Sequence, residues 1–235
     1  MKEDLTEINR LLIEQFGIPK RKKRKPNSLD ILIGTILSQN TNDKNSYKAY
    51  RNLKYKVKSW NEILRIRIST LENIIKVAGL GKQKALSIKS LIKKLKESNG
   101  KISLNHLSKL DNDFVIEELT KFKGIGVKTA SCVLLFSFGR NVCPVDTHVH
   151  RILNRVGLVK TNSPDKTYHQ IKDFIPENYG HSLHTNLLRL GREICLPKNP
   201  RCAICVIRSK CKYPYKNFSS TNKKSENKFF LLDKI

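Results

Sequence analysis

The chain has 235 residues and carries 46 lysines and arginines against 20 acidic residues, a formal net charge of +26. With 39% apolar residues it can build one large domain or two small ones, which excludes a chain that is disordered throughout. No apolar run approaches the roughly 18 residues that span a membrane, and the N-terminus is charged, so we expect a soluble, intracellular protein. The positive charge predicts a polyanionic partner such as nucleic acid, bound less tightly as salt rises.

Apolar residues recur at helical intervals along most of the chain, and two-residue alternation is scarce, so the pattern predicts an all-α fold. The apolar face of Leu5, Ile8 and Leu12 predicts a first helix that ends near Gly17. The six basic residues 20–25 then form either a solvated loop or a patch for phosphate contact or localisation. Buried or amphipathic helices are predicted at Ser28–Leu37, Ala85–Leu95, Val127–Phe138, Thr147–Val156, Pro164–Phe174 and Tyr179–Ile194.

Three local signals predict where other elements begin or end. Ser69 and Glu72 form a capping-box pattern ahead of an apolar run, with a stop at Gly79. Asp113 is expected to cap a helix that runs through Leu119. The tail after Cys211 lacks periodicity and is expected to fray, although residues 229–232 could dock locally.

The most specific pattern in the chain is the set of four cysteines near its C-terminus. They follow a C-x6-C-x2-C-x5-C spacing within 17 residues: Cys195, Cys202, Cys205 and Cys211. Zinc sites more often join two close cysteine pairs through a longer spacer, whereas a loop of this kind suits the larger [4Fe-4S] cluster. The alternatives are a pair of disulfides or four unrelated thiols, and nothing else in the sequence indicates an oxidising compartment.

A second informative segment runs from Phe122 to Ala130 and contains two glycines, Gly124 and Gly126, before the next helix begins. Glycines allow a tight turn and a close approach of the backbone to a ligand, and the amides of a helix N-terminus favour phosphate. Such a helix-hairpin-helix holds the DNA backbone without reading bases. A bare interhelical turn is the alternative, because the turn at 79–81 shows the same Gly-x-Gly pattern.

Two residues in or after this hairpin are candidates for catalysis. Lys128 lies in the first turn of an otherwise apolar helix, and an apolar, electropositive edge leaves part of an amine uncharged and nucleophilic. Asp146 lies 18 residues later, just before another helix. It could cap that helix, or it could face Lys128 as a general base and electrostatic partner. His148 follows; it is either a structural residue at a helix start or a phosphate or hydrogen-bond contact.

Together these segments resemble the endonuclease III family of helix-hairpin-helix DNA glycosylases. The likeness is carried by the hairpin from Gly124 to Ala130, by the stretch Val145 to His148 and by the cysteine loop, in the same order and at similar spacing. The segment Ile36–Asp43 also resembles an early helix and wedge loop of that family. Two departures are Phe122-Lys123, where the family commonly has Leu-Pro, and Asn40, which stands where the family has its glutamine.

The resemblance implies a two-lobed helical protein. One lobe would be a helical barrel with the hairpin, residues 29–140, and the other a discontinuous iron–sulfur domain, residues 1–28 and 141–211, followed by a flexible basic tail at 212–235. The implied partner is double-stranded DNA with damaged bases or abasic sites. The implied protein is a monomer that does not associate with a membrane. The implied location is the nucleoid of a prokaryotic cytoplasm, with a nucleus or organelle left open.

The resemblance also implies the chemistry. A damaged base, which in this family is commonly an oxidised pyrimidine, is flipped out of the duplex. Lys128 then attacks the sugar with help from Asp146, and the resulting Schiff base leads to strand cleavage by β-elimination. Gln39 or Asn40 would fill the gap left by the flipped base. Further DNA contacts are expected from Gly124, Gly126, Thr129, His148, Lys198 and Arg201.

Two other functions stay open at this stage. One is a mismatch glycosylase of the same superfamily that removes adenine or thymine without cutting the strand; such relatives generally lack the lysine at position 128. The other is a non-catalytic DNA-binding protein with a structural zinc. The sequence leaves the preferred lesion, a redox role for the cluster and the role of the basic block undecided.

Overall fold

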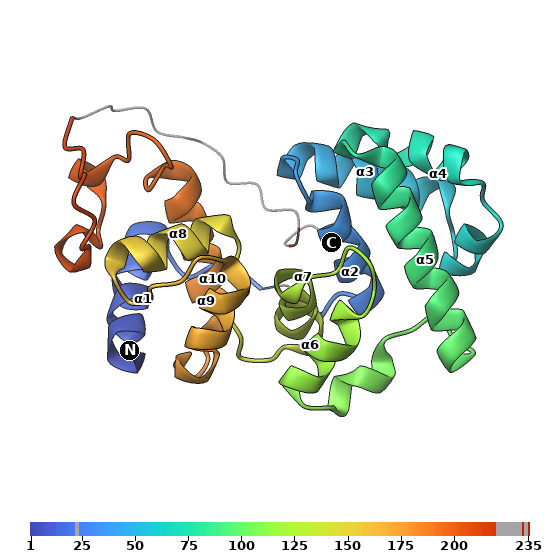
Figure 1. Cartoon of the computed structure of the whole chain (residues 1–235), viewed down its shortest axis with the longest axis horizontal. Helices are drawn as coiled ribbons and strands as arrows, with labels where there is room; N and C mark the ends of the chain where they lie inside the picture. The colour runs from blue at the N-terminus through green and yellow to red at the C-terminus, as the bar shows by residue number, and fades with distance from the viewer. Residues whose placement is uncertain (22–23, 220–231, 233–234) are drawn as a thin grey trace. The chain divides into compact units, whose positions relative to one another are not determined.

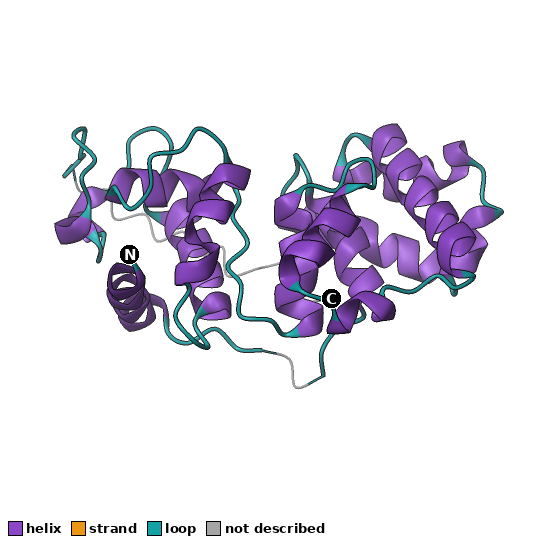
Figure 2. Cartoon of the chain, turned by 60° about the horizontal axis from the view of Figure 1, so that its bottom comes forward, coloured by secondary structure: helices purple, strands orange, loops and turns teal. Residues whose placement is uncertain are grey.

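All secondary structure in the described residues is helical, which confirms the predicted fold class (Figures 1 and 2). The computed structural model describes residues 1–21, 24–219, 232 and 235. The α-helices are α1 (Lys2–Phe16), α2 (Ser28–Ser38), α3 (Asp43–Lys56), α4 (Ile68–Ile75), α5 (Gly81–Asn99), α6 (Asn112–Thr120), α7 (Val127–Cys132), α8 (Thr147–Val156), α9 (Pro164–Ile171) and α10 (Gly180–Glu193). The short helices are η1 (Trp60–Leu64), η2 (Lys76–Ala78), η3 (Asn105–Lys109), the π-helical turn η4 (Val133–Phe138), η5 (Lys172–Phe174), η6 (Cys202–Ile204) and η7 (Arg208–Lys210).

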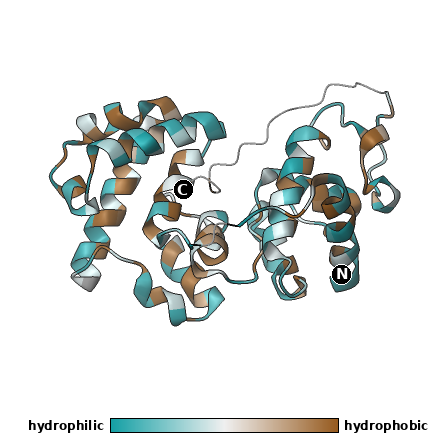
Figure 3. Ribbon diagram, turned by 180° about the vertical axis from the view of Figure 1, so that it is seen from behind, coloured by the Kyte–Doolittle hydropathy of each residue, from teal (hydrophilic) through white to brown (hydrophobic). Residues whose placement is uncertain are grey.

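The chain divides into two compact units, of which the first is discontinuous. Unit 1 comprises Met1–Arg21 and Arg140–Lys228, and unit 2 comprises Lys22–Gly139 and Phe229–Ile235. Within unit 2, α2 is the central helix: every residue from Ser28 to Leu37 except Asp30 is buried, and α3, α5, α7 and η4 pack around it. A helix that is apolar on all sides must be enclosed by others, and the surrounding helices are amphipathic (Figure 3).

Unit 1 is built on α10, which packs against both α1 and α8. The N-terminal helix is fixed at its C-terminal end, where unpaired carbonyls need donors. Asn186 Nδ2 donates to the carbonyl of Gly17 at 3.1 Å, and Arg189 Nη1 donates to that of Phe16 at 2.9 Å. The Arg189 guanidinium also lies 4.4 Å from the centre of the Phe16 ring. These contacts join the start of the chain to the helix that precedes the cysteine loop.

Two predicted caps are wrong. Ser69 lies inside α4, which begins at Ile68 without a side-chain cap, and the capping box forms instead at Ser59 and Glu62 ahead of η1. Asp113 also lies inside its helix, because Asp111 is the cap and accepts from the Asp113 amide at 2.7 Å. Helix α4 thus has no side-chain cap, whereas in α6 the neighbouring Asp111 takes the role predicted for Asp113.

Helix α3 was not predicted, although its buried residues Ser46, Ala49, Tyr50 and Leu53 have helical spacing. Asn42 caps it by accepting from the Asn45 amide at 2.9 Å. The predicted apolar docking of residues 229–232 lies outside the described residues except for Leu232, as does part of the basic block. None of the described helices combines the length and apolar character that crossing a membrane requires.

Candidate active site and cysteine loop

The hairpin forms as predicted, between α6 and α7. Its tip is anchored by Ile125, which is buried and donates its amide to the carbonyl of Phe122 at 3.1 Å. Gly124 has a φ of +86°, a conformation that side chains with a Cβ rarely adopt. A Cβ at Gly124 would lie 2.8 Å from the Ser87 hydroxyl on α5, so the hairpin is also held against that helix.

Gly126 is different, because a Cβ there would meet no protein atom within 4 Å. Its negative φ, −102°, imposes no need for glycine either, so the residue leaves an exposed stretch of backbone just before α7. Lys128 follows in the first turn of α7 and is half-buried. Thr129 is only 4% exposed, so its side chain belongs to the core of unit 2 and is withdrawn from the surface.

The Gln39–Asn40 loop meets the hairpin directly. Gln39 Nε2 donates to the carbonyl of Gly124 at 2.8 Å, across 85 residues of sequence. Asn40, the next residue, is exposed and has a φ of +52°. Gln39 therefore braces the loop against the hairpin, while Asn40 forms its exposed tip.

Leu80 is a candidate that sequence reasoning missed. It was read as part of a plain turn, yet it has a φ of +51° and is 50% exposed at the start of α5. An apolar residue held outward in the left-handed region is strained and exposed at the same time, which makes Leu80 a candidate for a functional contact. The Gly-Leu-Gly sequence was the available signal, since glycines on both sides of an apolar residue indicate a tight, exposed turn.

Asp146 is the N-cap of α8, as one of its two readings predicted. Its Oδ1 accepts from the amides of His148 at 2.9 Å and Val149 at 2.8 Å. The carboxylate is thus fixed at the positive end of the helix and is only partly buried. Asp146 belongs to unit 1, whereas Lys128 belongs to unit 2.

His148 connects this cap to the cysteine loop. Its Nδ1 lies 3.1 Å from Arg151 Nη2, and Arg151 donates from Nη2 to the carbonyls of Gly191 and Cys195, both at 2.8 Å. Burial lowers the pKa of His148, which favours the neutral ring, and Asp146 opposes this effect. The hydrogen bond to Arg151 favours the supporting reading of His148 over a phosphate contact.

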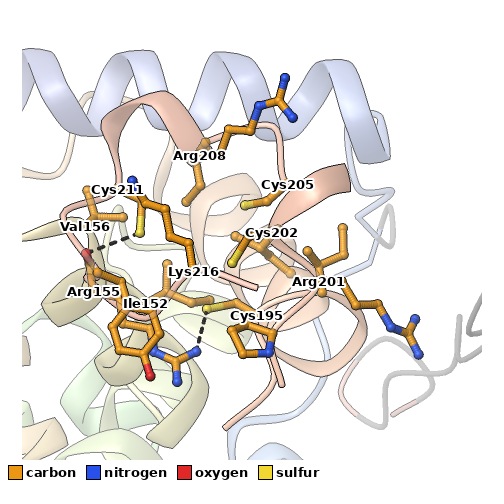
Figure 4. Close-up of a pocket in the computed structure, with 15 residues that line it drawn as sticks. Ile152, Arg155, Val156, Cys195, Arg201, Cys202, Cys205, Arg208, Cys211 and Lys216 are labelled. Carbon is orange, nitrogen blue, oxygen red and sulfur yellow. Dashed lines mark hydrogen bonds between the residues drawn. The ribbon is translucent and has the colours of Figure 1, made fainter. Parts of the chain in front are cut away.

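The four cysteines of the loop line one pocket and their sulfur atoms face it from different sides (Figure 4). The remaining lining combines apolar side chains with four cationic residues, Arg155, Arg201, Arg208 and Lys216. Burial raises the pKa of Cys205 to about 12, and the other three cysteines add to the effect because each would place a like charge nearby. Burial and the neighbouring thiols thus both oppose ionisation of Cys205. Within the described part of the chain, no three His, Cys, Asp or Glu side chains are grouped closely enough to hold one metal ion.

Arg155 supports this loop from α8. Its Nη1 donates to Cys195 Sγ at 3.3 Å and to the carbonyl of Leu196 at 2.7 Å, and Nη2 donates to the carbonyl of Pro197 at 2.9 Å. Its guanidinium also stacks 4.1 Å from the Tyr213 ring centre. Of the two predicted cations of the loop, Lys198 is exposed, and Arg201 donates to the carbonyl of Glu193 at 3.2 Å while its side chain points away from the sulfur atoms (Figure 4).

Comparison with known proteins identifies the family. Residues 33–177 match the model of the HhH-GPD superfamily of base excision DNA repair proteins. Endonuclease III of Thermotoga maritima is 34% identical over 89% of this chain and 92% of its own length. A trapped covalent endonuclease III–DNA intermediate superposes with a TM-score of 0.76 at 26% identity, over 90% of this chain and 96% of that one. A thermostable thymine-DNA glycosylase has the same fold, with a TM-score of 0.74 at 21% identity and coverage of 90% and 96%. The chain belongs to the HhH-GPD superfamily of base excision DNA repair proteins and, within it, to the endonuclease III family.

Proposed function

We propose that this protein binds DNA, flips a damaged base out of the duplex, removes it, and cleaves the abasic site that results. It is then a bifunctional DNA glycosylase and abasic-site lyase, and oxidised pyrimidines are its expected substrates. The observation that carries the proposal is Lys128, a half-buried lysine in the first turn after a hairpin with an exposed backbone at Gly126.

The proposed reaction uses Lys128 as the nucleophile. The Lys128 amine forms a bond to the C1′ of the sugar while the bond from C1′ to the base breaks, and the base leaves with that electron pair and takes up a proton. The sugar ring then opens to give the imine, which makes the C2′ proton acidic. Loss of this proton expels the 3′ phosphate and breaks the strand. Water finally hydrolyses the imine and frees the lysine.

Asp146 is proposed as the electrostatic partner of this step. A carboxylate stabilises the positive charge that develops on the sugar as the base departs and helps to accept the proton of the attacking amine. Its two hydrogen bonds from backbone amides hold the carboxyl group in a fixed orientation. His148 and Arg151 are proposed to keep this end of α8 in place.

Asn40 is proposed to fill the gap that the flipped base leaves. Gln39 already bonds to Gly124, whereas the Asn40 side chain stands at the exposed tip of the loop. Leu80 offers a second exposed tip, and apolar side chains of this kind can wedge between base steps. Phosphate contacts are proposed at Gly126 and Lys198; Thr129 is left out because it is buried.

The cysteine loop is proposed to hold a [4Fe-4S] cluster. The donor set is entirely sulfur and the four thiols line one pocket, and their spacing, with single cysteines flanking one C-x2-C pair, suits an iron–sulfur cluster better than zinc. When bound, the cluster supplies a structural cross-link and fixes the cations of the loop. Unit 1 is accordingly proposed as the iron–sulfur domain and unit 2 as the helical barrel. The protein is proposed to act in the cell compartment that contains the DNA.

Borohydride trapping tests the proposed function. Wild type should be captured covalently on a duplex with one abasic site, while Lys128→Ala should bind that duplex without being captured. Equal capture of the two proteins would remove Lys128 from its role. The fold is shared with a thymine-DNA glycosylase, so the fold alone does not show whether this enzyme also cleaves the strand. Covalent capture of wild type would distinguish a bifunctional enzyme from a monofunctional one.

A further inference from the structure

A buried lysine outside the catalytic set joins the two exposed tips. Lys84, on the first turn of α5, is 2% exposed. Its Nζ donates to the carbonyl of Leu37 at 2.9 Å and to the carbonyl of Ala78 at 2.8 Å. No carboxylate within the described residues forms an ion pair with it, and burial lowers its pKa to about 8. A buried lysine without an ion-pair partner is costly, so a specific function has to explain its presence.

The two carbonyls identify that function. Leu37 lies in the last turn of α2 and Ala78 ends η2, and the last carbonyls of a helix have no partner within the helix. A cation at such an end is also favoured by the helix dipole. Each carbonyl comes shortly before an exposed residue in the left-handed region, Asn40 in one case and Leu80 in the other. One ammonium group thus caps both helix ends from which the tips project.

We propose that Lys84 is a positioning residue that holds Asn40 and Leu80 at a fixed separation, so that both enter the duplex together. This inference rests on the proposed function of Asn40 as the residue that fills the gap. Three elements are then linked in unit 2: Lys84 joins the two tips, and the Gln39 bond to Gly124 joins the first tip to the hairpin. Without the ammonium, two carbonyls lose their donor and each tip moves independently.

The test uses a duplex with a tetrahydrofuran abasic analogue opposite 2-aminopurine, whose fluorescence changes when neighbouring groups enter the stack. Lys84→Met replaces the ammonium by an apolar group of similar length. We expect it to bind this duplex within about threefold of wild type, since phosphate contacts dominate affinity, and to lose roughly half or more of the fluorescence change. Lys93→Met is the matched control, because Lys93 is an exposed lysine on the same helix, and it should keep the full change.

Borohydride trapping on a natural abasic duplex separates this proposal from the proposed function. Wild type that is not trapped refutes the lyase, whereas a Lys84→Met protein that gives the full fluorescence change refutes the positioning role. Trapping of Lys84→Met should stay within about threefold of wild type, and an equal loss of trapping and fluorescence would indicate a general folding defect and overturn the proposal. If circular dichroism shows that Lys84→Met does not fold, Lys84→Gln replaces it. The shorter amide side chain of Lys84→Gln reaches at most one of the two carbonyls, so this variant should lose part of the fluorescence change. A Lys84→Gln protein with the full fluorescence change would overturn the proposal.

Discussion

The burial of Lys84 predicts a specific pH dependence of stability. Burial lowers its pKa from 10.5 in the unfolded chain to about 8 in the folded protein. Each unit of such a shift corresponds to roughly 1.4 kcal/mol, so the full effect of about two and a half units is on the order of 3 kcal/mol.

The sign follows from proton binding. Below about pH 8 the lysine is charged in both states, and the folded protein bears the whole cost of burying the charge. Between about pH 8 and 10.5 the folded state releases the proton while the unfolded state keeps it, so the free energy of unfolding rises with pH by this contribution. Lys84→Met lacks the group and therefore lacks this rise.

Urea unfolding of wild type and Lys84→Met at a series of pH values from 7 to 10 measures the effect. Trp60, the single tryptophan, lies in η1 of unit 2, so its fluorescence reports the unit that contains Lys84. The wild-type free energy of unfolding minus that of the variant should increase by about 2 to 3 kcal/mol across this range. A difference that stays flat would show that the Lys84 ammonium is not desolvated as the structure indicates.

Three other substitutions have clear expected outcomes. Gly191→Ala would place a Cβ 2.6 Å from the His148 Cβ, so we expect α8 to shift, stability to fall by about 1 to 3 kcal/mol in thermal unfolding, and turnover to fall; unchanged turnover would separate His148 from the site. Asp146→Asn keeps an acceptor for the cap but loses the charge, so single-turnover base release should slow by roughly a hundredfold or more with little change in melting temperature, and a normal rate would leave Asp146 as a cap only. Cys202→Ser should give colourless or unstable protein after purification under anaerobic conditions, and a brown, stable protein would contradict the cluster assignment.

The parts of the fold that were predictable depend on short-range pattern. The all-helical class, the bounds of α8 and the hairpin follow from apolar spacing, glycines and the Asp146 cap, all within a few residues of sequence. The Ser69 and Asp113 caps were wrong because an S-x-x-E pattern occurs twice, of which only the one at Ser59 forms a capping box, and because Asp111 and Asp113 are equally suitable in sequence.

The parts that were missed depend on contacts between distant segments. Lys84 looks like a surface lysine in sequence, and only the convergence of α2, η2 and α5 shows that it is buried between two helix ends. The choice between Gln39 and Asn40 could not be made until Gln39 was found to bond to Gly124, 85 residues away. The four cysteines are the opposite case, because their spacing within one loop brought them to one pocket as predicted.

The most direct test of the central claim is to locate the covalent bond itself. The chain has 33 lysines, so the position of the captured amine has to be determined directly. Wild type trapped with borohydride on an abasic duplex would be digested with protease and nuclease, and the modified peptide sequenced by mass spectrometry. We predict a single reduced sugar adduct on the side chain of Lys128. An adduct on any other lysine or on the N-terminal amine would contradict the proposed mechanism.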